Sequence, residues 1–142
     1  MTRQFAMLMA AGILTAGAAG PLQAETIHYA TTLAGSAEVP PNTSAGTGTV
    51  AADLNTNTRT FTYTVTYSGL TGPAVAAHFH GPAAPGTNAP PVIAMKSLAS
   101  PIKGSAVLTP DQMADLQAGK WYFNVHTKAH PGGEIRGQLT AP

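Results

Sequence analysis

Apolar and polar side chains alternate along much of this chain with the period of a β-strand. The clearest stretch is residues 60–67, where aromatic or aliphatic residues alternate strictly with threonines. Because successive side chains of a strand point to opposite faces, this stretch predicts a strand with one buried and one solvated face. Residues 48–54 predict a second strand, and the Asn/Thr-rich residues 55–58 between the two stretches predict a tight hairpin turn.

The remaining pattern predicts an all-β fold with one short helix. Further strands are expected at residues 27–33, 75–80, 92–98, 103–108, 121–126 and 134–139. A helix is predicted near residues 110–118, because Thr109 can cap free amides, Pro110 suits the first turn and Gly119 can end it. Many short strands separated by Gly/Pro turns indicate a mostly antiparallel β-sandwich of the immunoglobulin-like or Greek-key type.

Two segments rich in proline and glycine interrupt the strands. Residues 35–48 read as a loop or a sheet edge, because proline cannot donate a hydrogen bond to a neighbouring strand. Residues 81–91 contain four prolines and two glycines, which indicates an ordered loop. This second loop is either the wall of a site or a plain surface connection.

The first 24 residues have the pattern of a secretory signal peptide. Arg3 precedes an uncharged apolar run over residues 5–20, and the small residue Ala24 follows. A membrane anchor is the alternative, but the run is shorter than the roughly 20 apolar residues that a spanning helix needs. We therefore expect a single domain over residues 25–142, without a membrane span, in the periplasm or outside the cell.

Charge and cysteine content narrow the classes of partner. The chain has no cysteine, so an exported domain must gain its stability from packing and strand pairing, with a bound ion as a further contribution. Without Arg3, the formal positive and negative charges balance, and no basic run occurs. Nucleic acid and anionic membranes are therefore not expected as partners.

Histidines supply the main candidate for a functional site. His78 and His80 alternate with the apolar residues of one predicted strand, and His126 does so in another, so all three point away from the core. His130 follows in a turn and is a candidate fourth ligand. Three or four neutral imidazoles suit copper or zinc better than calcium or magnesium, which prefer oxygen ligands, and we favour copper. The alternative is that these rings only form hydrogen bonds on a polar sheet face.

A few other side chains carry weaker signals. Glu134 and Arg136 are candidate binding residues, although their spacing also predicts pairing with each other or with neighbouring strands. Met95 and Met113 are interpreted as packing residues rather than copper ligands. His28 lies on a separate predicted strand and has no evident partner.

Two segments also resemble a known family. AAHFHGPAAPGTNAPPV, which begins at Ala76, and GKWYFNVHTKAHPGGEIRGQL, which begins at Gly119, resemble the CHRD domain, the module named for chordin and found in many secreted bacterial proteins. The resemblance spans residues 25–139 and implies a β-rich extracellular module. It implies no settled catalytic activity.

Three functions remain open on this basis. The first is an exported module that binds a metal ion, copper in preference to zinc, through the histidines. The second is a metal-free structural or interaction domain that recognises an envelope or extracellular protein. The third, ranked last, is a metal-dependent redox enzyme. No catalytic residue is assigned, because the sequence contains no Gly-x-Ser-x-Gly elbow, no thiol nucleophile and no phosphate-binding loop.

Overall fold

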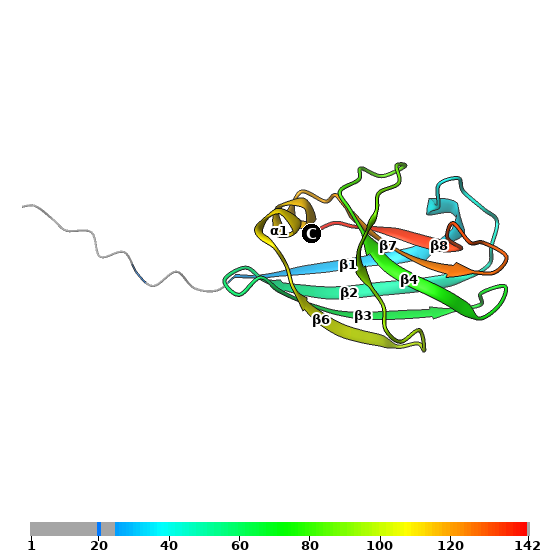
Figure 1. The fold of residues 1–142 in the computed structure, drawn as a ribbon, viewed down its shortest axis with the longest axis horizontal. Helices are drawn as coiled ribbons and strands as arrows, with labels where there is room; N and C mark the ends of the chain where they lie inside the picture. Colours follow the sequence, from blue (N-terminus) through cyan, green and yellow to red (C-terminus); the bar gives the residue numbers. More distant parts are fainter. Residues whose placement is uncertain (1–19, 21–24, 142) are drawn as a thin grey trace, which may run out of the picture.

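A computed structural model describes Gly20 and residues 25–141. The predicted signal peptide, apart from Gly20, lies outside the described residues. The strands are β1 (Thr26–Ala34), β2 (Thr47–Asn55), β3 (Thr60–Ser68), β4 (Ala74–His80), β5 (Pro91–Ala94), β6 (Ile102–Val107), β7 (Trp121–Thr127) and β8 (Ile135–Leu139). A short 3₁₀ turn, η1 (Gly35–Ala37), follows β1, and one helix, α1 (Pro110–Gln117), precedes β7. The mostly antiparallel all-β prediction and the predicted helix are confirmed (Figure 1).

The strands form one antiparallel sheet rather than the two separate sheets of a sandwich. Their order is β5-β4-β7-β8-β1-β2-β3-β6, and β1 meets β8 through a single residue pair, Ala34 and Arg136. The sheet folds over at this narrow junction, so its two halves face each other (Figure 1). Across the interior, the ring centroids of Phe61 on β3 and Phe79 on β4 are 5.2 Å apart. The result approaches a barrel and encloses one core.

The predicted hairpin between β2 and β3 is present. Leu54 pairs with Phe61, and both side chains are fully buried. In the turn, the side-chain oxygen of Asn55 accepts hydrogen bonds from the amides of Asn57 and Thr58 at 3.1 and 3.0 Å. This local bonding is the reason that asparagine favours tight turns.

Helix α1 begins with a reciprocal capping box. The Thr109 hydroxyl accepts a hydrogen bond from the Gln112 amide at 3.1 Å, and the Gln112 side chain accepts one from the Thr109 amide at 3.0 Å. Leu116 is fully buried, and Met113 packs against the core beside it. The helix thus covers one end of the sheet. Among the residues that the structure describes, no helix has the length and hydropathy needed to cross a bilayer.

Strand β7, which carries His126, is buried on both faces over residues 121–125. Trp121, Phe123 and Val125 of β7 are fully buried in the core, as their alternation predicts. On the opposite face, however, Tyr122 and Asn124 are each only 2% exposed. Loops cover this second face, so it is a second, polar interior rather than a solvated surface.

Candidate functional site

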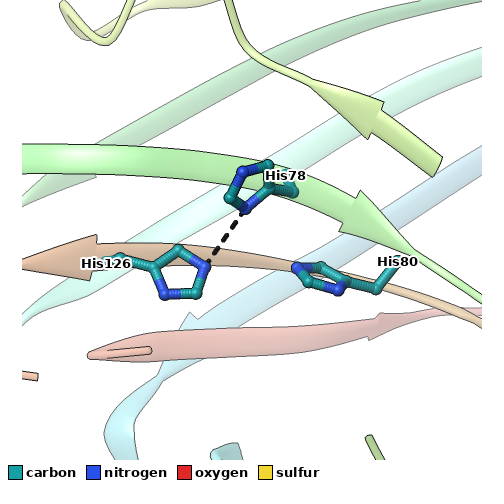
Figure 2. Close-up of side chains that lie close together, drawn as sticks. All are labelled: His78, His80 and His126. Carbon is teal, nitrogen blue, oxygen red and sulfur yellow. Dashed lines mark hydrogen bonds between the residues drawn. The ribbon is translucent and has the colours of Figure 1, made fainter. Parts of the chain in front are cut away.

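Three histidines from two neighbouring strands converge on one point. His78 and His80 come from β4, and His126 comes from β7, where it pairs with Ala76 of β4. The ring centroid of His78 lies 5.3 Å from that of His80 and 5.1 Å from that of His126, and the His80–His126 separation is 6.2 Å. Figure 2 shows the three rings turned toward one another. The predicted convergence is confirmed.

Backbone carbonyls fix which ring nitrogens face the centre. His80 Nδ1 lies 2.8 Å from the Ala89 carbonyl oxygen, and His126 Nδ1 lies 2.9 Å from the Pro131 carbonyl oxygen. A carbonyl oxygen can only accept, so each Nδ1 carries the proton and donates it, which leaves each Nε2 unprotonated and able to accept a hydrogen bond or bind a metal ion. His126 Nε2 accepts a hydrogen bond from His78 Nδ1 at 3.2 Å (Figure 2). His80 Nε2 is buried and has no hydrogen-bond partner among the described residues.

The nitrogen geometry is close to that of a metal site. One donor atom from each histidine lies within 4.8 Å of the other two. In a tetrahedral zinc site with bonds of 2.0–2.1 Å, ligand nitrogens lie about 3.3 Å apart. The 3.2 Å separation between His78 Nδ1 and His126 Nε2 is close to this value, and His78 would have to carry its proton on Nε2 instead of Nδ1 for this pair to bind an ion. Small side-chain adjustments toward a common ion would bring His80 into the same coordination shell.

The surroundings keep two of the rings neutral. Burial lowers the pKa of His78 below its usual value, and the neighbouring His126 and His80 lower it further. Burial also lowers the pKa of His80, although the Ala89 carbonyl opposes this effect by stabilising the charged ring. A metal ion binds neutral imidazole, so these shifts favour the form that can act as a ligand.

His80 is packed against a stack of two further side chains. Its ring lies parallel to that of Tyr122, with centroids 4.7 Å apart and an interplanar angle of 4°. The guanidinium of Arg136 stacks on the Tyr122 ring, with its central carbon 3.4 Å from the ring centroid. Arg136 is 2% exposed and donates hydrogen bonds to the Asn88 side chain at 2.8 Å and to the Thr87 carbonyl. This candidate binding residue therefore has its partners within the chain.

Comparison with known proteins assigns the family. The model of the CHRD domain matches residues 29–139, from β1 to the end of β8. The chain belongs to the CHRD domain family. The match includes all three clustered histidines, and membership supports a role as a binding module. No curated protein and no solved structure matched this chain.

Glu134 occupies a different position in the CHRD domain from Arg136. Its fully buried carboxylate accepts hydrogen bonds from the hydroxyls of Ser44, Thr71 and Thr127 and from the Thr71 amide, all at 2.6–2.8 Å. Of the two predicted alternatives, pairing with each other is wrong, and pairing with a neighbouring strand holds for the bond from Thr127 of β7 but not for those from Ser44 and Thr71, which lie in loops. The reason is that Glu134 lies before β8 begins, where the two-residue period of a strand does not yet apply.

The other two histidines lie apart from the cluster. His130 is in the turn after β7, where its backbone exchanges hydrogen bonds with that of Thr127. The structure does not bring it into the group formed by the other three rings. His28 is also separate, and the expectation that it has no partner is wrong, because its Nδ1 lies 2.6 Å from a carboxylate oxygen of Asp53 on β2.

Sequence reasoning missed Glu38, which lies in the polar interior of the CHRD domain. Its side chain is 4% exposed, and one carboxyl oxygen, Oε1, has no hydrogen-bond partner among the described residues. Burial raises its pKa to about 7, although the charge of Arg136 and the Asn124 side chain act in the opposite direction. The carboxyl group fills the space that a Cβ atom on Gly133 would need. Glu38 is a single glutamate in a proline-rich loop, and nothing in the neighbouring sequence indicates that its side chain is buried.

Proposed function

We propose that this CHRD domain is an exported module that binds one transition-metal ion, copper in preference to zinc, through His78, His80 and His126. The observation that carries the proposal is the state of His80. Its Nε2 is buried without a hydrogen-bond partner in the part of the chain that the structure describes, while its Nδ1 is held by a carbonyl in the arrangement typical of metal-ligating histidines. A buried polar atom without a partner destabilises a fold by about 1–3 kcal/mol, and a bound ion would remove this penalty.

The donor set supports copper as the preferred ion. All three donors are imidazole nitrogens, which suit both copper and zinc, and divalent copper binds a given nitrogen site more tightly than zinc does. The predicted signal peptide supports export to the periplasm or the cell exterior. Three protein ligands would leave at least one coordination position for water or for a partner's side chain.

Titration of the purified protein with copper(II), and separately with zinc, tests the proposal. We expect one ion per chain, and replacement of all three clustered histidines by alanine should abolish this binding. His28→Ala is the matched control, because His28 is an exposed histidine paired with Asp53 on another part of the sheet. Unchanged stoichiometry in the triple variant would refute the proposed site. Partner capture that is insensitive to chelators and to the triple substitution would favour the metal-free interaction domain.

A further inference from the structure

Three stacked planar side chains hold three consecutive residues of one loop. Arg136, Tyr122 and His80 come from three adjacent strands, β8, β7 and β4. His80 pairs directly with Tyr122 across β4 and β7. Arg136 is the diagonal neighbour of Tyr122, since it pairs with Asn124, two residues further along β7. Each member of the stack is at least nine-tenths buried.

The loop residues 87–89 are held by each member of the stack in turn. Arg136 binds the Thr87 carbonyl and the Asn88 side chain. The Tyr122 hydroxyl lies 3.2 Å from the Ala89 carbonyl oxygen and 3.1 Å from the Ala89 amide. The same Ala89 carbonyl accepts the proton of His80 Nδ1 at 2.8 Å. The Ala89 carbonyl, which orients His80, is therefore held in place by Tyr122 directly and by Arg136 through residues 87 and 88.

The orientation of His80 decides whether it can be a ligand. An imidazole that turns over directs Nε2 away from the other two histidines, and one that shifts its proton to Nε2 no longer offers a lone pair there. The Ala89 carbonyl prevents both changes, because only a protonated Nδ1 can donate to it. Arginine suits the remote end of this chain of contacts, since its planar fork binds two acceptors while its face stacks on an aromatic ring. Lysine cannot do both.

From these contacts we propose that Arg136 is a positioning residue. It acts through Tyr122 and the loop residues 87–89 to fix the His80 ring with Nε2 facing the other two histidines. The effect on metal affinity rests on the proposed function. The effect on the orientation of the His80 ring does not depend on the proposed function, because all of these contacts are present without an ion.

Nitrogen-15 NMR of the imidazole groups, recorded on the metal-free protein, tests the positioning role directly. In the unaltered protein, His80 should be a single Nδ1-protonated tautomer. In Arg136→Gln and Arg136→Lys, this signal should become a mixture of tautomers. Gln138→Ala is the matched control, because Gln138 lies on the same strand and binds the other end of the same loop, at the Ala83 carbonyl, at 2.9 Å. His80 should keep its single tautomer in this control.

Zinc affinity of the same variants supplies the second readout. Loss of an outer contact to a metal-ligating histidine typically weakens affinity 10–100-fold, and we expect this loss for both Arg136 variants and not for Gln138→Ala. If the Arg136 variants fail to fold, Tyr122→Phe provides the test instead. This variant keeps the stacked ring and removes only the hydroxyl that contacts Ala89, so the same two readouts should change. A single tautomer and an affinity within twofold of the unaltered protein in the folded variants would overturn the positioning role. If the unaltered protein bound no ion but the tautomer still changed, the positioning role would stand and the proposed metal function would fall.

Discussion

Replacement of Glu134 by glutamine should cause a large loss of stability at neutral pH. Burial raises the pKa of this carboxyl, but hydrogen bonds from Ser44, Thr127 and Thr71 outweigh burial and lower it from 4.5 to about 2. One pKa unit corresponds to about 1.4 kcal/mol, so the ionised form stabilises the fold by about 3 kcal/mol relative to the protonated form. Glutamine has a similar size but turns an NH₂ group toward donors that need an acceptor, so we expect a loss of about 2–4 kcal/mol.

The sign of the pH dependence follows from the same shift. Because the folded state holds the Glu134 proton less tightly than the unfolded state, the stabilisation is complete above about pH 4.5 and is lost as the pH falls toward 2. Urea unfolding followed by circular dichroism at pH 7, 4.5 and 3 measures both effects. Asp111→Asn, at an exposed position in the first turn of α1, is the control and should change stability by at most about 0.5 kcal/mol. If Glu134→Gln unfolded like the unaltered protein at pH 7, or kept its acid dependence, the reasoning would be wrong.

Two further predictions concern the polar interior around Glu38. The folded-state pKa of Glu38, about 7, lies above its unfolded value, so its contribution to stability is complete below about pH 4.5 and is lost as the pH rises through 7. Between pH 4.5 and pH 7.5, the free energy of unfolding of Glu38→Gln should therefore rise by about 3 kcal/mol relative to that of the unaltered protein. Urea unfolding of both proteins at the two pH values measures this change, and a difference that stays constant would contradict the pKa shift. Gly133→Ala should lose about 2–3 kcal/mol, because Gly133 has a φ of 129° and its missing Cβ would meet Glu38 and Asn124. The neighbouring Gly132→Ala meets no atom within 4 Å and should be nearly neutral in thermal unfolding, and equal losses in the two variants would refute the steric argument.

Features that depend on nearby residues could be predicted from the sequence. The β2–β3 hairpin follows from strict alternation and an asparagine turn, and the start of α1 follows from its capping box. The common direction of His78, His80 and His126 also follows from local periodicity, because each alternates with core residues on its own strand.

Features that depend on strand order and on loops crossing the sheet could not be predicted. Nothing in the local pattern shows that β1 meets β8 through one residue pair, and this junction makes a single folded sheet from an expected sandwich. The position of Glu38 beneath Gly133 and of Ala89 beside His80 likewise depends on contacts between distant segments. The polar face therefore looked solvated in the sequence, whereas these loops bury it.

The segment PGGEIR, which carries much of the family resemblance, has a structural explanation that is separate from metal ligation. The Pro131 carbonyl orients His126, and Gly133 leaves room for the Glu38 carboxyl. Glu134 joins two loops through their hydroxyls, and Arg136 holds a third. None of these residues belongs to the histidine cluster, yet together they fix the elements that surround it. A chain could therefore keep this segment and its fold while losing the cluster, so the segment alone does not indicate the proposed metal binding, which also needs the three histidines.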